Sequence, residues 1–595
     1  MRVADYVVRK LAENGIDTVF GLTGGGIMHL VDAIALNGQV KFQPVHHEEF
    51  AGVCADGYAR SGKRFGVAFG TTGPGAAHLF SACAAAWQDS VPVIFIVGQV
   101  KTSDSSRLLG LQVRQNGTFE LDCIESFSTI TKKSTISSSA SDAIFAIDEA
   151  IELCQAGRPG PVLLEMPLDV QGMKIPEDLE SSYVSVNVTH VDSEQEERFK
   201  LTVKDILSQA ERPIMLVGSG LVRSNSHQQL REFCDASGIP FVVTQFAREL
   251  GGLENPLFLG SPGVKANKSA NLGLSEADLI IAVGTSLHQQ VVGWNVKAFA
   301  QLPSRKIWTE IDEDTLKARA HLVDYSFQIE SLRSIQLLQE ALSEIDLNRV
   351  RLNRWRQRAM TLRERYLLHF PKHEQVDNRF CLYELVSALS ARAERFRAVV
   401  TDAGLAWYAV PQHFFLSAGS SFISSGSFGA MGVGLPLAIG SATATQQPTL
   451  CVTGDGSIMM CLQELATLSS SRLPILLVIN SNGGYLSIKS THDKFFSGRK
   501  IGTDDSNGVF IPSIEELAHT FRIAYSKASS VQELETLLDD DKCKNLREPL
   551  IIEAMIYEDQ KIEPVLVSRL NPMTGQMESG GLQDLEPFDD KEETR

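Results

Sequence analysis

The strongest candidate for chemistry is segment 454–457, whose sequence is Gly-Asp-Gly-Ser. Asn482 follows Asp455 by 27 residues in the sequence. A strand before this segment, a helix over 459–471 and a second strand ending at Ile479 would bring both side chains to the carboxyl ends of adjacent parallel strands, where open α/β sheets bind ligands. A carboxylate, an amide oxygen, a backbone carbonyl and phosphate oxygens are hard ligands of the kind that Mg²⁺ prefers. The alternative is that Gly-Asp-Gly forms only a turn.

The second candidate is Glu48. It follows a short apolar strand expected over 40–45 and precedes a helix rich in small residues, so its carboxyl group is expected at a buried strand-to-helix junction. The alternative is an N-terminal charge that interacts with the helix dipole. His29, His46 and His78 are candidate acid–base groups near turns of the same region, although a structural role is the more usual one for such histidines.

The composition excludes several classes of protein. The chain has 595 residues, and 55 basic against 72 acidic side chains give a net charge of −17, which disfavours a nucleic-acid partner. Nine cysteines without a Cys-x-x-Cys pair indicate neither a disulfide framework nor a zinc site. The apolar runs 91–97 and 473–479 are far shorter than the roughly 18 to 20 residues of a membrane span. With no signal peptide in the first residues, we expect a cytoplasmic location and no membrane partner.

The elements that must position these candidates fall into three blocks. Short apolar runs separated by helical patterns predict βαβ units and parallel sheets. We therefore expect an α/β protein of three doubly wound parallel-sheet domains, the middle one Rossmann-like. The expected bounds are 1–170, 200–345 and 379–560 for the domains, 171–199 and 346–378 for the linkers, and 561–595 for an acidic tail whose last 20 residues we interpret as mobile chain. Strands are expected at 18–20, 40–45, 66–69, 93–97, 214–217, 241–243, 279–283, 306–310, 398–400, 449–452, 475–479 and 550–554.

The motifs together resemble those of thiamine diphosphate-dependent enzymes of the acetolactate synthase group. The resemblance rests on Glu48, then Thr-Gly-Pro-Gly at 72–75, then the Gly-Asp-Gly segment and Asn482. It covers nearly the whole chain, and further matching segments are 19–21 with Gly24 and Gly25, 89–92, 98–99, 217–220, 429–436 and 462–467. Agreement in order and spacing is specific for the cofactor and less specific for the substrate.

The resemblance implies thiamine diphosphate and Mg²⁺ as cofactors. Glu48 would be catalytic, through a hydrogen bond to the pyrimidine ring in a dry pocket. Met431 would wedge between the two cofactor rings and keep the amine of one close to the reacting carbon of the other, the alternative being core packing. Asp455, Asn482 and the Gly484 carbonyl would bind the metal. The residues expected to bind the cofactor are Gly24, Gly25, Glu48, Thr72, Gly73, Pro74, Asp402, Ala403, Gly404, Gly429, Met431, Gly454, Asp455, Gly456, Ser457, Asn482, Gly484 and Tyr485.

The reaction implied is decarboxylation of pyruvate or a similar 2-oxo acid, with transfer of the remaining unit to a carbonyl acceptor. The alternatives are a simple 2-oxo acid decarboxylase or lyase, a ketosugar carboligase, and a non-catalytic subunit of the same fold. The family's site lies between the first block of one chain and the third block of another, which implies a homodimer or homotetramer. The partners are small molecules, the 2-oxo acid and its acceptor.

Three features depart from the synthase pattern. Phe119 stands where the group has a Gln that lines the substrate, so the donor or acceptor specificity is expected to differ. The alternatives are a local shift of the alignment by one residue and a Phe that only packs. FAD is a further cofactor implied for the middle block, at Gly218, Ser219, Gly220, Gly263, Gly284, Thr285 and Ser286, although the charged cluster that usually follows is replaced by Leu-His-Gln-Gln at 287–290. Segment 581–587 resembles relatives of sugar and surface-polysaccharide pathways and could fold over the site as a lid, the alternative being solvated chain.

Overall fold

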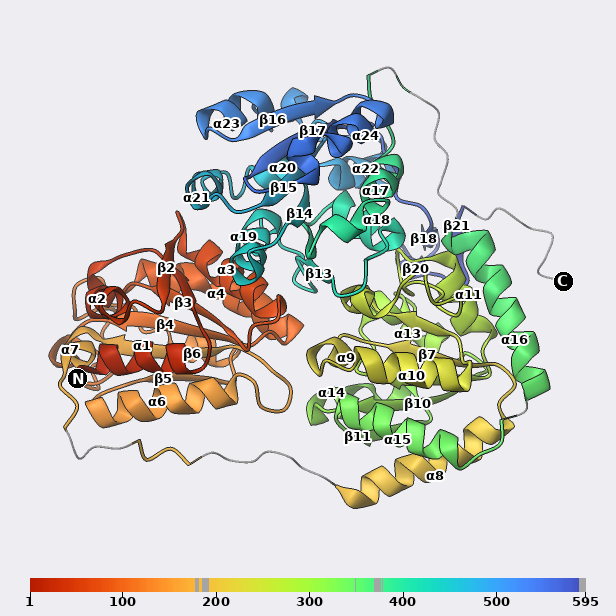
Figure 1. The fold of residues 1–595 in the computed structure, drawn as a ribbon, viewed down its shortest axis with the longest axis horizontal. Helices are drawn as coiled ribbons and strands as arrows, with labels where there is room; N and C mark the ends of the chain where they lie inside the picture. The colour runs from red at the N-terminus through yellow and green to blue at the C-terminus, as the bar shows by residue number, and fades with distance from the viewer. Residues whose placement is uncertain (177–180, 185–191, 348, 369–375, 377, 588–595) are drawn as a thin grey trace. The chain divides into compact units, whose positions relative to one another are not determined.

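The computed structural model describes residues 1–176, 181–184, 192–347, 349–368, 376 and 378–587. The chain forms two compact units (Figure 1). Unit 1 contains Met1–Val188, Arg395–Ala406 and Ile423–Glu558, and unit 2 contains Thr189–Glu394, Trp407–Phe422 and Asp559–Arg595.

The first part of unit 1 is a parallel sheet of six strands in the order β2-β1-β3-β4-β6-β5. Its strands are β1 (Thr18–Gly21), β2 (Lys41–Pro44), β3 (Gly66–Gly70), β4 (Val93–Gln99), β5 (Lys133–Ile136) and β6 (Val162–Pro167). Its longer helices are α1 (Val3–Glu13), α2 (Met28–Asn37), α3 (Glu48–Arg60), α4 (Pro74–Asp89) and α6 (Ala140–Leu153). The central strands β3 and β4 are buried along their whole length, as the uninterrupted apolar runs at 66–69 and 93–97 predict.

The second part of unit 1 is another six-stranded parallel sheet, in the order β13-β12-β14-β15-β17-β16. Its strands are β12 (Ala398–Thr401), β13 (Ser421–Ser424), β14 (Thr449–Gly454), β15 (Ile475–Ser481), β16 (Ala524–Ala528) and β17 (Leu550–Met555). Its helices include α19 (Gly434–Thr445), α20 (Asp455–Ile458), α21 (Glu464–Ser471), α22 (Leu486–Phe495), α23 (Ile514–Thr520), α24 (Val531–Asp539) and α25 (Asp541–Lys544). The single helix expected over 459–471 is wrong in its start, because the chain forms the short helix α20 directly after β14 and resumes helix only at Glu464.

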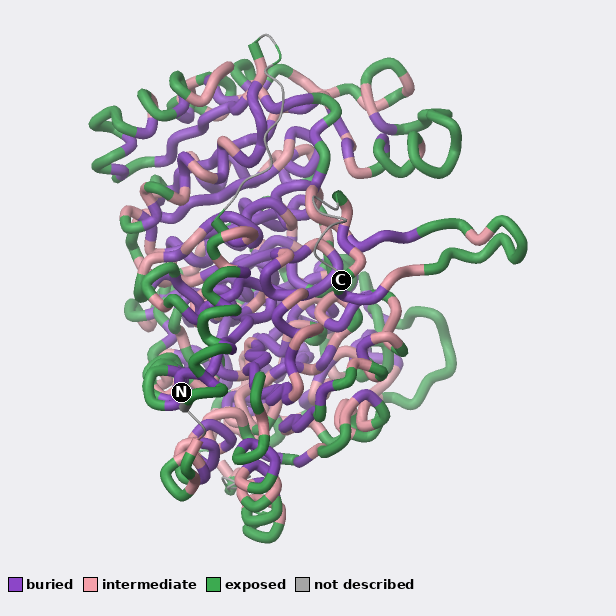
Figure 2. Tube along the Cα trace, turned by 90° about the vertical axis from the view of Figure 1, so that its right-hand side faces the viewer, coloured by how far each residue is buried: buried purple, intermediate pink, exposed green. Residues whose placement is uncertain are grey.

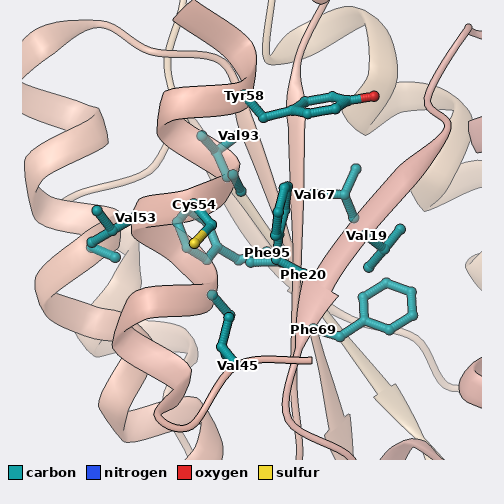
Figure 3. Close-up of a cluster of buried hydrophobic side chains, with 14 of the residues drawn as sticks. Val19, Phe20, Val45, Val53, Cys54, Tyr58, Val67, Phe69, Val93 and Phe95 are labelled. Atoms are coloured by element: carbon teal, nitrogen blue, oxygen red, sulfur yellow. The ribbon is translucent and has the colours of Figure 1, made fainter. Parts of the chain in front are cut away.

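The two sheets of unit 1 share one hydrophobic core, and α3 packs directly against α19. Glycines allow this close crossing: a Cβ atom on Gly57 would lie 2.2 Å from the Leu437 carbonyl oxygen, and one on Gly440 would lie 1.9 Å from that of Cys54. On its other side α3 covers the first sheet, where Tyr58 packs edge-on against Phe20 with ring centroids 5.7 Å apart (Figure 3). Helix α3 is therefore buried from both sides, and its first residue is Glu48.

Unit 2 is built on a parallel sheet of five strands in the order β11-β10-β9-β7-β8. Its strands are β7 (Pro213–Val217), β8 (Phe241–Val243), β9 (Leu279–Val283), β10 (Arg305–Glu310) and β11 (Tyr325–Gln328). Its longer helices are α8 (Ser193–Gln209), α10 (His227–Ser237), α11 (Lys268–Glu276), α14 (Glu313–Arg319), α15 (Ser331–Ser343), α16 (Arg349–Leu362), α17 (Leu382–Ser390) and α18 (Leu405–His413). Helix α18 begins in unit 1. The three parallel sheets confirm the predicted fold class. Figure 2 shows the buried residues along the interior of the trace and the exposed ones at its edges and in its outer loops.

The segment expected to be an acidic tail differs from that prediction. It forms two antiparallel pairs, β18 (Val565–Leu566) with β21 (Leu585–Glu586) and β19 (Ser568–Leu570) with β20 (Met577–Ser579). Leu582 is buried in a core cluster of unit 2, and the Leu566 N–H donates to the Val264 carbonyl. This segment is therefore docked through Leu566, Leu582 and Leu585, which are buried, while the hairpin of β19 and β20 between them is largely exposed. Residues 588–595 lie outside the described residues.

Among the helices that the structure describes, none combines the length and the apolarity needed to cross a membrane. All nine cysteines are free thiols and buried.

Candidate active site

Asp455 and Asn482 lie at the ends of neighbouring parallel strands. Gly454 of β14 is in register with Asn480 of β15, so the residues that follow the two strands meet at one edge of the sheet. The Asp455 carboxylate accepts hydrogen bonds from the backbone N–H groups of Gly456 (2.8 Å), Asn482 (2.9 Å), Gly483 (2.7 Å) and Gly484 (3.3 Å). The placement expected from the 27-residue spacing is present.

The chemistry of this edge fits a hard cation. Asn482 Oδ1 is buried and has no hydrogen-bond partner among the described residues, an arrangement that costs free energy unless a ligand supplies one. Burial raises the pKa of the Asp455 carboxyl, although the backbone N–H groups oppose the shift. A divalent cation would satisfy the amide oxygen and stabilise the buried carboxylate, as Mg²⁺ does with oxygen ligands.

Three glycines in the second part of unit 1 each border open space. A Cβ atom added to Gly404 (φ +77°), Gly429 (φ +70°) or Gly454 would meet no heavy atom within 4 Å. Bare backbone next to open space lets peptide N–H groups approach an anion such as a diphosphate. Gly456 and Gly484 differ, because a Cβ on them would lie 2.6 Å from the Tyr485 ring and 2.2 Å from the Thr503 carbonyl oxygen. These two glycines are needed for contacts within the chain.

The Asp402 carboxylate is engaged by the chain itself. It accepts hydrogen bonds from the N–H groups of Ala403 (2.7 Å), Gly432 (3.0 Å) and Gly434 (3.0 Å) and from the Thr453 hydroxyl (3.1 Å). Its side chain is fully buried, and burial raises its pKa. Asp402 thus holds the loop before α19, and any contact of segment 402–404 with a diphosphate would come from the backbone of the two residues that follow.

Met431 lies in that same loop with a side chain that is 36% exposed. The alternative role for a methionine is core packing, and Met431 is absent from the buried core of unit 1. The next residue, Gly432, has φ of +78°, and a Cβ there would lie 2.6 Å from Met460 Cβ. Met431 is therefore exposed in the loop that Asp402 holds.

Glu48 opens α3 directly after its N-cap residue His47. The carboxyl group faces the turn between β3 and α4, where a Cβ atom on Gly75 would lie only 3.3 Å from Glu48 Oε1. Pro74 begins α4, and Gly73 before it has φ of +66°, a conformation that favours glycine. The fold thus brings the turn at 72–75 and the Glu48 carboxyl group together, although they are separate in the sequence.

Glu48 has a partner that the sequence did not reveal. Its Oε2 lies 2.9 Å from Nδ1 of His78, and the His78 ring stacks on that of His47 with centroids 4.4 Å apart and an interplanar angle of 25°. These three side chains could be taken for a metal site, since their ligand atoms lie within 4.8 Å of one another. Nearly parallel imidazole rings, however, direct their in-plane lone pairs side by side and not toward one ion.

The start of α3 is also tied to helix α21 in the second part of unit 1. The backbone N–H of His46 donates to Glu464 Oε1 at 2.9 Å, and the Thr467 hydroxyl donates to Oε2 at 2.6 Å. Burial raises the pKa of Glu464, and the hydrogen bonds oppose the shift. Glu464 belongs to the matching segment 462–467, whose role the motif alone did not give: it anchors the Glu48 junction on α21.

Phe119 lies beside the same turn. A Cβ on Gly73 would be 2.2 Å from the Phe119 carbonyl oxygen. Phe119 is 71% exposed and has φ of +63°, a strained conformation for a residue with a large side chain. The Glu120 carboxylate fixes the loop by accepting the N–H groups of Ser106 (2.5 Å) and Asn116 (2.9 Å), so the aromatic ring is held exposed next to the Glu48 turn.

The residues expected to bind FAD make contacts within unit 2. A Cβ atom on Gly218 would lie 2.1 Å from the Gly284 carbonyl oxygen, and one on Gly263 would lie 1.9 Å from that of Gln290. The Thr285 carbonyl accepts the Trp308 Nε1–H at 2.8 Å. These glycines serve the close approach of neighbouring backbone segments, so the flavin prediction rests on the resemblance and not on an open cradle. The remaining residues of this set are Ser219, Gly220 and Ser286.

Comparison with known proteins identifies the class. Three family models match: the N-terminal thiamine pyrophosphate binding domain at residues 1–125, the central domain of these enzymes at 202–334, and the C-terminal thiamine pyrophosphate binding domain at 402–554. The chain therefore belongs to the thiamine pyrophosphate (thiamine diphosphate) enzymes, in the family that includes the acetolactate synthase large subunits.

The relatives within this class are named as acetolactate synthases. The isozyme 2 large subunit of Escherichia coli (strain K12) is 31% identical over 572 residues, which is 95% of this chain and 97% of the relative. The large subunit of Parasynechococcus marenigrum (strain WH8102) is 30% identical over 531 residues, covering 87% and 82%. The large subunit of Corynebacterium glutamicum is 28% identical over 576 residues, covering 95% and 88%. The family resemblance stated from the motifs is confirmed.

Proposed function

We propose that this chain decarboxylates pyruvate or a similar 2-oxo acid and joins the remaining unit to a carbonyl acceptor, with thiamine diphosphate and Mg²⁺ as cofactors. The observation that carries the proposal is the buried Asn482 Oδ1, unpartnered among the described residues, beside the Asp455 carboxylate. Thiamine diphosphate supplies the electron sink on which a 2-oxo acid loses carbon dioxide.

The chain's own residues divide the work. Asp455, Asn482 and the Gly484 carbonyl would hold the metal, and the bare backbone at Gly404 and Gly429 would receive the diphosphate. Glu48 would share a proton with the pyrimidine ring, since its carboxyl group is almost buried at the start of α3. The open strand ends at the metal edge argue against a non-catalytic subunit, which would not need to keep them.

Product analysis separates the reaction classes. The purified protein is incubated with Mg²⁺, thiamine diphosphate and pyruvate, alone and with a ketosugar or a second 2-oxo acid, and carbon dioxide and products are measured. Carbon–carbon bonded products support the proposal. Aldehyde as the sole product would favour a simple decarboxylase, and no carbon dioxide from any 2-oxo acid would contradict the proposed function.

A homodimer or homotetramer is part of the proposal, and its basis is the family resemblance. Within one chain, the hydrogen bond between His46 and Glu464 already joins the Glu48 junction to helix α21 in the second part of unit 1. Light scattering during size exclusion measures the oligomer, and a monomer that retains full activity would contradict a site shared between chains.

We expect Phe119→Gln to change the ratio of products from competing acceptors several-fold, because an amide replaces an aromatic wall beside the Glu48 turn. Stability should change by less than about 0.5 kcal/mol, since the side chain is exposed and Gln meets the same backbone strain at φ of +63°. Leu111→Gln, an exposed apolar position nearby in the sequence, is the matched control. Identical product ratios in the wild type, Phe119→Gln and Leu111→Gln would contradict the proposal that Phe119 lines the substrate.

We propose FAD as a further cofactor bound by the middle domain, and we assign it no step in the reaction. The protein purified without added flavin is then expected to show the visible absorption band of bound flavin. A colourless protein that added FAD cannot colour would contradict the assignment of the seven middle-domain residues. Activity of the colourless protein would separate this result from the proposed reaction.

A further inference from the structure

The hydrogen bond between Glu48 and His78 joins a buried group to an exposed one. The Glu48 side chain is 8% exposed, whereas that of His78 is 45% exposed. His78 lies in the first turns of α4, after the 72–75 turn that faces the carboxyl group. The imidazole is thus placed between the carboxyl group and solvent.

His47 holds the imidazole in place. Its own Nδ1 accepts the Glu49 N–H at 3.2 Å, which fixes the His47 ring as the cap of α3. The His78 ring lies on this fixed ring with centroids 4.4 Å apart. Two elements, α3 and α4, therefore define the position of Nδ1, and the hydrogen bond does not depend on an unsupported surface side chain.

We propose that His78 is a positioning residue that holds the Glu48 carboxyl group and exchanges a proton with it, connecting that buried group to water. This rests on the proposed function, in which Glu48 must gain and release a proton. An imidazolium ring gives its Nδ1 proton to Oε2: the N–H bond breaks, an O–H bond forms, and the neutral ring then accepts the hydroxyl at Nδ1. Nε2 exchanges with solvent.

The same heavy-atom geometry serves both protonation states, because imidazole nitrogen can donate or accept. An amide or a hydrocarbon at this position could not take up the proton. The other titratable groups beside the pair are the ring of His47, the N-cap residue of α3, and the Glu464 carboxyl on α21, which accepts the His46 N–H. Neither hydrogen-bonds to the Glu48 carboxyl in the described part of the chain, so His78 is the residue to test.

The first experiment needs no cofactor. Nitrogen-15 histidine spectra of the free protein report which ring nitrogen carries hydrogen, and the His78 signals are assigned by their loss in His78→Gln. We expect hydrogen on Nδ1 in the wild type and a changed tautomer in Glu48→Gln. Unchanged His78 signals in Glu48→Gln would overturn the inference, because the ring would not then sense the carboxyl group.

The second experiment measures exchange of the thiazolium C2 proton of bound thiamine diphosphate with deuterium, without substrate. His78→Gln keeps a hydrogen-bond donor and His78→Phe keeps an aromatic ring for stacking. Both should lower the exchange rate by at least about tenfold and flatten its dependence on pH between about 5 and 8. Cofactor affinity should stay within about threefold, since the metal and diphosphate contacts are untouched.

The control is His519→Gln, at an exposed histidine near the end of α23. Wild-type exchange rates and pH profiles in both His78 variants would overturn the inference while leaving the proposed function intact. A wild-type protein that binds the cofactor without accelerating exchange would instead refute the proposed function, and the inference with it. Loss of cofactor binding in both variants would assign His78 a purely structural role and contradict the inference.

Discussion

Glu48→Gln is expected to reduce decarboxylation by at least about 10²- to 10⁴-fold, the range over which a positioned acid–base group contributes. Gln has the size of Glu and fits the space beside Gly75, where Glu48 Oε1 lies 3.3 Å from the position that a Cβ atom on Gly75 would take. The fold and the metal edge should therefore persist. What is lost is the ability of the side chain to exchange a proton with the pyrimidine ring.

The matched control for this substitution is Glu49→Gln. Glu49 stands in the same first turn of α3 and carries the same charge near the helix dipole. Loss of that interaction should cost each variant about 0.3–1 kcal/mol of stability. If Glu48 were only an N-terminal helix charge, both variants would behave alike; the catalytic role requires a large rate loss in Glu48→Gln alone. Initial rates of carbon dioxide release, with cofactor affinity from fluorescence titration, decide between these outcomes.

The sequence predicted correctly that Asp455 and Asn482 lie at neighbouring strand ends, and the reason is physical. Asp455 and Asn482 follow two buried strands joined by one helical connection, and a right-handed parallel crossover places such strand ends side by side whatever the details of the helix. The error in the helix start at 459–463 was therefore harmless. The sequence could not show that Asn482 Oδ1 is buried without a hydrogen-bond partner among the described residues. That property depends on which donors the folded chain places near the atom.

The contacts around Glu48 were missed for the opposite reason. His78 lies 30 residues after Glu48, with strand β3 between them. Glu464 lies 418 residues after His46, and no motif in the sequence indicates that the two are partners. Such pairs arise from the packing of α3 against the first sheet, α4 and α19, which no local periodicity encodes. The docked segment 565–587 was misread likewise, since its acidic composition masked the few leucines that bury.

Asn482→Ala is expected to weaken Mg²⁺-dependent binding of thiamine diphosphate at least about 100-fold, beyond the 10- to 100-fold typical of residues that only support a metal ligand. The substitution is clean because Oδ1 makes no hydrogen bond to any described residue, so its removal breaks none. The backbone N–H of residue 482 still donates to Asp455, and the thermal stability of the protein without metal should stay unchanged or rise.

Asp455→Ala should abolish metal-dependent binding too, but at a structural cost. It leaves the N–H groups of 456 and 482–484 without their acceptor, at about 1–3 kcal/mol for each buried group that finds no other partner. Calorimetric titration of Mg²⁺ at fixed cofactor, with Asn545→Ala at an exposed helix end as control, measures the effect. Comparing the two variants distinguishes the loss of a metal ligand from the loss of hydrogen bonds within the fold. Wild-type Mg²⁺ affinity in Asn482→Ala would contradict the metal assignment, whatever Asp455→Ala does to the fold.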